Sequence, residues 1–395
     1  MHFPLKIIKE KYQKLFPSSP KEDRSFEGPA TQPEEQAKID SVSDAYTKWL
    51  CDLWHILQKQ TYHQIKVDDL EAFGIRHEKL ELDTGVDGLL QPLNENTFFL
   101  PNFEKVKNLQ PDPDQWDFED LMIDLGEWPE PWKSPWKSEF YRAVDRDHAS
   151  SLCSALDVAF ASLKWKEYEK KESICLQDQT DWKPAHLDDM YVNHFVSIDS
   201  DFSEAFDFDD WRVSGFWLDS KRDSWPENIW LSRNKPHIMV TISHDCPHDN
   251  GSLLLCEIQA IIELMIVRLV NNSVPQHNIV PVLLYSYTGD KHGRVLQAYM
   301  DDKNLVIRTS KFYDFSAKLD ANLKLLLQYM VGDLVGSTMT LTHPQLESIN
   351  PRVGLFSDLV GSETTLETPD PKSIDRTEDE DSDSGFGSTG SSGSA

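Results

Sequence analysis

The stretch that decides the fold runs from Pro236 to Val270 and reads PHIMVTISHDCPHDNGSLLLCEIQAIIELMIVRLV. Its first part, Pro236–Ile242, is apolar and rich in β-branched residues, which predicts a short strand. A proline and an Asn-Gly pair then interrupt the apolar pattern, which predicts a turn over His244–Gly251. Because apolar residues return directly after this turn, we expect the chain to enter a buried core on both sides of it.

Further apolar segments follow, and together they predict the remaining elements of a core over residues 231–345. These are a second strand over Leu253–Gln259, a helix over Ala260–Val270, a third strand over Ile279–Tyr287, a hairpin of Gly293–Tyr299 with Asn304–Arg308, and a closing helix over Leu319–Val331. The expected fold class is therefore α/β (α+β), with a mixed central sheet and flanking helices.

This order of strand, hairpin, strand, helix and strand resembles the core of the PD-(D/E)XK nucleases. In that family an Asp that follows a Pro, and an acid-x-Lys in the next strand, hold Mg²⁺ and orient a water for phosphodiester attack. Pro236-His237 and Glu257-Ile258-Gln259 stand at these positions. The resemblance implies that Glu257 is the acid of the motif, with His237 in place of the metal-binding Asp and Gln259 in place of the Lys.

Two of the three motif positions therefore depart from the nuclease pattern. Histidine is a poor ligand for Mg²⁺, and glutamine carries no charge to stabilise a developing anion. We expect a non-catalytic protein without a cofactor, in which a nuclease-like core serves interaction or accessory roles. The alternative is a metal-dependent phosphodiesterase or nuclease, with Glu257, Gln259 and His237 as catalytic residues, and Mg²⁺ or Mn²⁺ held by Glu257 and His237.

A second resemblance rests on three stretches of the same core: Pro281-Val-Leu-Leu, Arg294-Val-Leu-Gln-Ala-Tyr299 and Phe312-Tyr-Asp-Phe315. They are similar to segments of uncharacterised proteins from filamentous fungi. This resemblance implies no particular activity.

The chain divides by composition into four ranges: an N-terminal amphipathic segment and linker (1–40), an acidic Trp-rich region that packs on the core (41–230), the nuclease-like core (231–345) and a disordered acidic Ser/Gly tail (346–395). In Met1–Phe16 four lysines alternate with apolar residues, which predicts a helix that docks on the core; the alternative is a helix for a partner or a membrane surface.

The region 41–230 is expected to be mostly helical or irregular. Apolar residues recur at helical spacing within Tyr46–Leu57 and within Ser150–Lys171, where a charged run closes the second helix. A Pro/Trp repeat over 127–138 predicts a rigid loop that caps the core, or an aromatic clamp for a partner or a ligand. In Asp199–Trp211 acids alternate with aromatics, which indicates an edge strand or loop, or alternatively a docking segment for a basic partner.

The net charge of −28 arises from 67 acidic and 39 basic residues. Residues 110–230 hold 28 acids against 12 bases, whereas residues 231–345 hold 10 of each. This distribution favours a basic protein partner and disfavours nucleic acid. The most apolar stretch, Leu253–Val270, contains three charged residues, so no membrane span is expected.

Five cysteines without paired spacing predict free thiols and an intracellular protein, cytoplasmic or nuclear. A small-molecule enzyme that uses a Trp-rich pocket is a third functional hypothesis. The oligomeric state is left open by the sequence.

Overall fold

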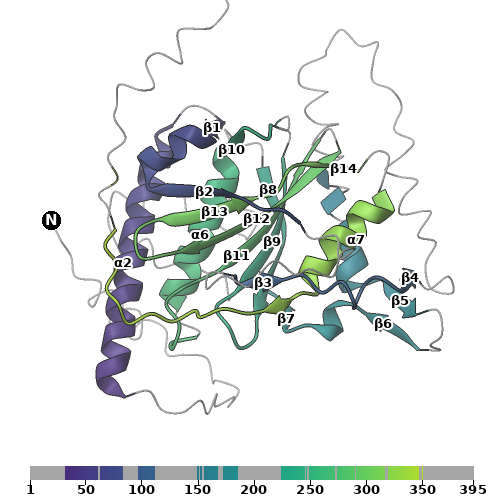
Figure 1. The fold of residues 1–395 in the computed structure, drawn as a ribbon, viewed down its shortest axis with the longest axis horizontal. Coiled ribbons are helices and arrows are strands. Elements are labelled where there is room, and N and C mark those ends of the chain that lie inside the picture. The colour runs from purple at the N-terminus through teal and green to yellow at the C-terminus, as the bar shows by residue number, and fades with distance from the viewer. Residues whose placement is uncertain are drawn as a thin grey trace, which may run out of the picture. The chain divides into compact units, whose positions relative to one another are not determined.

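A mixed sheet of eight strands forms the centre of the described chain (Figure 1). The structure is a computed structural model. It describes residue 349 and residues 32–346, apart from 61–62, 83–96, 112–148, 151, 154, 168–171, 186–223, 245, 247–248, 272–273, 290 and 316–318. The N-terminal segment 1–31, the Pro/Trp repeat 127–138, Asp199–Trp211 and nearly all of the tail 346–395 lie outside these residues.

The elements, in chain order, are α2 (Pro33–Gln58), β1 (Gln64–Lys66), the 3-10 helix η1 (Val67–Phe73), β2 (Ile75–Lys79), β3 (Phe99–Leu100), β4 (Leu109–Pro111), β5 (Lys164–Glu167), β6 (Ser173–Cys175), the 3-10 helix η2 (Gln177–Gln179), β7 (Trp182–Pro184), β8 (Ser224–Ser232), β9 (Ile238–His244), β10 (Ser252–Leu254), α6 (Leu255–Asn271), β11 (Val282–Thr288), β12 (His292–Met300), β13 (Leu305–Thr309), β14 (Tyr313–Asp314), α7 (Leu319–Met330) and β15 (Asp333–Leu334). The large sheet has the order β2-β13-β12-β11-β9-β8-β7, with β14 paired to β12.

Strands β9 and β11 lie parallel at the middle of this sheet, and every one of their residues is buried. The chain passes from β9 to β11 through α6, and such a crossover is what a parallel neighbour requires. Strands β11, β12 and β13 then continue as antiparallel neighbours. The expected mixed central sheet with flanking helices is confirmed, as are the strand at Pro236–Ile242, the hairpin and the closing helix.

The two faces of the sheet have different coverings. On one face, Met239, Leu283 and Tyr285 join a large apolar cluster that includes residues of α7 and of the helical residues 155–161. Helix α6 contacts β11 from the other face, and α2 packs against α6 (Figure 1). The indole Nε1 of Trp54 on α2 donates a hydrogen bond to the buried Glu263 on α6, with 2.6 Å between N and O.

The expected second strand over Leu253–Gln259 is wrong. Only Ser252–Leu254 is extended, as β10, and it pairs with β1 rather than with the large sheet. Helix α6 begins at Leu255, five residues before the expected start at Ala260. A short apolar run fits a buried strand and a buried helix equally well, which explains why periodicity failed here.

Two further boundaries differ from expectation. The helical residues after 149 end at 161, and Lys164–Glu167 forms β5, in which Trp165 is buried. Helix α2 begins at Pro33, inside the expected linker, because proline suits the first turn of a helix and Glu34 and Glu35 follow it there.

Strands from both sides of residue 230 share the large sheet, since β2, β7 and β8 all pair within it. The described residues belong to one compact unit that extends to Pro351. The expected division between 41–230 and 231–345 therefore falls inside one sheet. All five cysteines are free, as expected. Among the described helices, none is long and apolar enough to cross a membrane.

Candidate functional site

A cluster of buried polar side chains lies at the carboxyl ends of β9 and β11, and its members are His244, Ser286, Arg294 and Glu257. Ends of parallel strands are where ligands bind in many α/β folds, so this cluster is the first place to look for chemistry. The sheet register brings three of them together. Ser286 on β11 lies directly opposite Arg294 on β12, and His244 ends β9 beside them.

Glu257 reaches the cluster from the first turn of α6. One of its carboxylate oxygens accepts a hydrogen bond from the backbone N–H of Leu254, at 2.9 Å. This is half of a capping box, in which an acid at the third helical position satisfies a backbone donor that the helix leaves unpaired. The contact stabilises the start of α6 and gives Glu257 a structural role.

Arg294 forms a fork with the same carboxylate. Its Nε donates to Oε1 of Glu257 at 2.8 Å, and its Nη2 donates to Oε2. The side chains are 2% and 0% exposed, respectively, so this ion pair is removed from water. Two parallel charge-assisted hydrogen bonds of this kind are both strong and orientation-specific.

The rest of the guanidinium is also engaged. Nη1 of Arg294 donates to the backbone carbonyl of Ser252 at 3.0 Å and to that of Asp249 at 3.4 Å. The aromatic ring of Phe312 lies 4.4 Å from the guanidinium carbon, within range of a cation–π interaction. Arg294 therefore ties β12 to the turn after β9, to the start of α6 and to the segment after β13.

His244 and Ser286 complete the cluster. The imidazole Nε2 and the serine Oγ are 2.8 Å apart, and both residues are fully buried. Burial raises the pKa of Glu257, but the charges of Arg294 and His244 and the hydrogen bonds from Arg294 and Ser286 outweigh it, so the pKa lies below its usual value. The carboxylate is ionised and its charge is balanced inside the protein.

A serine–histidine pair next to a carboxylate has the residue types of a nucleophilic site. Here, however, none of the three side chains is exposed, and the carboxylate accepts hydrogen bonds from Arg294 and from the backbone of Leu254. The arrangement is suited to fixing the crossover of the sheet. Chemistry on a dissolved substrate would require contact with solvent that these side chains do not have.

His237, the second expected site residue, lies far from Glu257. It precedes the first residue of β9, whereas the charge of the last, His244, acts on Glu257, and seven residues of strand span about 23 Å. The His237 ring packs edge-on against Phe99, with 5.3 Å between centroids, and against Phe98. Both phenylalanines belong to the apolar cluster on the face opposite α6.

The imidazole of His237 is neutral in this environment. Burial is the main reason that its pKa falls to about 3, and the nearby charge of Lys235 adds to the effect. Backbone groups of Val335 and Phe98 act in the opposite direction and are outweighed. His237 is therefore a core histidine.

Gln259, the third expected site residue, points away from Glu257. Helical residues that are two positions apart in the sequence are separated by about 200° around the axis. The side chains of Glu257 and Gln259 therefore lie on different sides of α6. Gln259 is fully buried, and neither of its amide atoms has a hydrogen-bond partner among the described residues. Four residues on, Glu263 shares this side of α6 and contacts Trp54 of α2.

The residues do not fit the Mg²⁺ or Mn²⁺ site that the nuclease resemblance implies. Both oxygens of Glu257 accept hydrogen bonds from Arg294, and His237 is at the other end of β9. Within the described residues, no three His, Cys, Asp or Glu side chains converge as a set of metal ligands. The expected catalytic and metal residues are thus found in three separate environments.

Sequence reasoning missed the partnership of Glu257 with Arg294. One signal was available: Arg294 is the one Lys, Arg, Asp or Glu residue in the predicted strand Gly293–Tyr299, and a buried arginine requires an acidic partner. The identity of that partner was not evident, because Glu257 was assigned to a strand.

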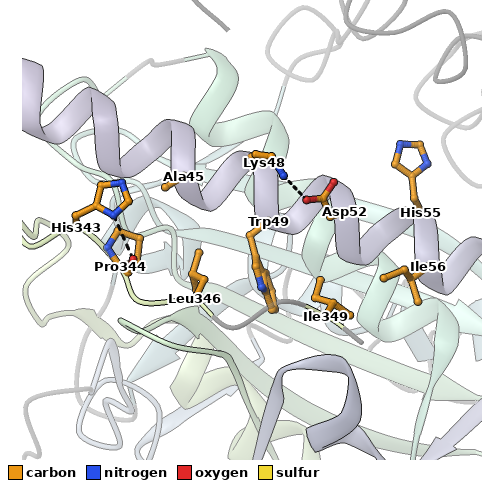
Figure 2. A pocket seen from close by; sticks show the side chains of 10 residues that line it. All are labelled: Ala45, Lys48, Trp49, Asp52, His55, Ile56, His343, Pro344, Leu346 and Ile349. Atoms are coloured by element: carbon orange, nitrogen blue, oxygen red, sulfur yellow. Dashed lines mark hydrogen bonds and ion pairs between the residues drawn. The ribbon is translucent and has the colours of Figure 1, made fainter. Parts of the chain in front are cut away.

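A separate pocket of about 620 Å³ lies between α2 and residues 343–346 and 349 (Figure 2). We call it the α2 pocket. It is lined by Ala45, Lys48, Trp49, Asp52, His55, Ile56, His343, Pro344, Leu346 and Ile349. Only one of these is a tryptophan, and the Pro/Trp repeat that suggested a Trp-rich pocket lies outside the described residues.

Comparison of the chain with protein-family models, with curated proteins and with solved structures found no match.

Proposed function

We propose that this chain is a non-catalytic interaction protein, in which a nuclease-like core has no working metal site. One observation supports this most directly: the carboxylate of Glu257 is fully engaged by Arg294 and by the backbone of Leu254. A hydrolytic Mg²⁺ site needs carboxylate oxygens that are available to the ion. The positive charge of Arg294 already balances the charge of this carboxylate.

The partner that we propose is a basic protein. The chain holds 67 acidic and 39 basic residues, and the excess of acid is concentrated in residues 110–230. Such a charge imbalance speeds encounter with a basic surface and opposes encounter with nucleic acid. We place this interaction inside the cell, because the five cysteines are all free thiols.

Two assays on the full chain test the proposal. Hydrolysis of bis(4-nitrophenyl) phosphate and of plasmid DNA, with Mg²⁺ or Mn²⁺, should proceed at the rate of buffer alone. A rate above buffer that is lost in Glu257→Gln would overturn the non-catalytic assignment.

The second assay measures binding of a fluorescent lysine-rich peptide against salt concentration. Binding should weaken steadily as the salt concentration rises, since exposed charges are screened. The control is an acidic peptide of equal length. Equal binding of both peptides would rule out charge as the basis of recognition.

A further inference from the structure

The α2 pocket is built from apolar side chains below a charged rim. Figure 2 shows Trp49 of α2, Leu346 and Ile349 lining the space between α2 and residues 343–346 and 349. Lys48 and Asp52 lie on the rim, joined by an ion pair of 2.6 Å, and both are more than half exposed. A volume of about 620 Å³ is in the ordinary range for a ligand site.

Both walls of the pocket are fixed by other parts of the fold. Trp49 packs against Gly74, where an added Cβ would lie 2.7 Å from the indole ring. The opposite wall is held by a hydrogen bond from the N–H of Gln345 to the carbonyl of Asp302, at 2.7 Å. Each wall is therefore held in place by a contact outside the pocket.

We propose that the occupant of the α2 pocket is the chain's own N-terminal segment, Met1–Phe16. The composition of this segment suits an apolar pocket with a charged rim. It carries Leu5, Ile8, Leu15 and Phe16 for the apolar floor, and four lysines against a single glutamate. The rest of the chain holds 35 basic and 66 acidic residues, so this segment is a strongly basic stretch attached to an acidic protein.

Two carboxylates lie near the pocket. Asp52 stands on the rim, where it pairs with Lys48, and the exposed Asp302 accepts a backbone hydrogen bond from Gln345 in the opposite wall. Lysines of the segment would meet these carboxylates while its apolar side chains enter the pocket. This is how basic amphipathic helices are generally recognised, with apolar anchors in a groove and charges around it.

The chain length also permits the contact. Residues 17–32 connect the segment to Pro33, and sixteen residues span up to roughly 50 Å when extended. The pocket residues of α2, from Ala45 to Ile56, lie about 18 to 35 Å along the helix from Pro33. A tether of this length gives an effective concentration on the order of 1 mM, which is enough to fill a site of modest affinity.

The consequence is regulatory. A basic amphipathic partner that uses the same pocket must first displace Met1–Phe16, so the segment acts as a built-in competitor. The occupancy by itself does not depend on the non-catalytic function proposed above, and it is tested separately.

The test uses a fluorescent peptide with the sequence of residues 1–16 and full-length chains. In one chain, Leu15→Asp and Phe16→Asp break the apolar side of the tethered segment. With a peptide Kd of about 50 µM and a tether at about 1 mM, the peptide should bind this chain about twentyfold more tightly than wild type. Equal affinity for both chains, or no binding to either up to 500 µM, would overturn the proposal.

Location is tested in the same Leu15→Asp/Phe16→Asp chain. Asp52→Lys, on the pocket rim, should weaken peptide binding about fivefold or more. Glu34→Lys is the matched control, because Glu34 forms the same type of exposed i,i+4 pair on the same helix, outside the pocket. It should change binding less than twofold. Equal weakening by both substitutions would refute the pocket as the site.

Discussion

Replacement of Arg294 by methionine should destabilise this protein strongly, because it leaves the buried carboxylate of Glu257 without its counter-ion. Breaking a buried ion pair by removing one partner typically costs about 3–5 kcal/mol. The carbonyls of Ser252 and Asp249 would also lose a donor, at about 1 kcal/mol for a buried acceptor. We expect a loss of about 4 kcal/mol in the free energy of unfolding, out of the 5–15 kcal/mol typical of a folded domain.

Urea unfolding followed by far-UV circular dichroism measures this loss, provided that the m-value is unchanged. The partner variant Glu257→Gln removes the charge and keeps an acceptor for Leu254. In the double variant Arg294→Met/Glu257→Gln, the loss should be at least about 2 kcal/mol smaller than the sum of the single losses, since no unpaired charge is left. Asp52→Asn, which breaks the exposed pair with Lys48, should cost under about 1 kcal/mol.

Two results would refute the conclusion that Arg294 and Glu257 form a buried ion pair in which each residue depends on the other. One is a loss below about 1 kcal/mol in Arg294→Met. The other is additivity of the two single substitutions to within about 0.5 kcal/mol.

Other expected outcomes concern pH and backbone strain. The pKa of His237 is about 3 in the fold and about 6.5 in the unfolded chain, so the unfolded state takes up its proton first as pH falls. Stability should therefore drop by about 2 kcal/mol from this residue between about pH 8 and pH 5. His237→Phe should remove that drop in urea titrations, and parallel profiles would contradict the assignment. The pKa of Glu257 is lowered by the fold, so its contribution is present above about pH 4.3 and is lost below it, and Glu257→Gln should show a smaller acid loss than wild type. Gly74→Ala should cost about 2 kcal/mol or more, because φ is +67° and the new Cβ would collide with Trp49; a cost under 0.5 kcal/mol would contradict that contact.

Apolar runs in the sequence were sufficient to predict the centre of the sheet. The segments that became β9, β11 and the β12–β13 hairpin are short, bounded by turn residues and contain β-branched or aromatic residues, which favours a strand. The segment after the turn was ambiguous, because an unbroken apolar run has no period. There the outcome depended on Glu257, whose contact with the N–H of Leu254 starts a helix.

The candidate site could not be predicted, because it depends on contacts between distant residues. Glu257 and Arg294 are 37 residues apart, and only the register of β11 with β12 and the crossover through α6 bring them together. His237 was chosen for its place beside a proline, but its environment is set by Phe98 and Phe99, which arrive from far earlier in the chain. Motif spacing carries no information of this kind.

The most direct measurement of the central claim is a calorimetric titration of Mn²⁺ into the full-length wild-type chain and into Glu257→Gln. If Glu257 serves only as the internal partner of Arg294, the two chains should give the same heats, from weak association with the many surface carboxylates. A saturable site in the wild-type chain that is missing from Glu257→Gln would show that this carboxylate binds metal, and would contradict its assignment as a structural residue.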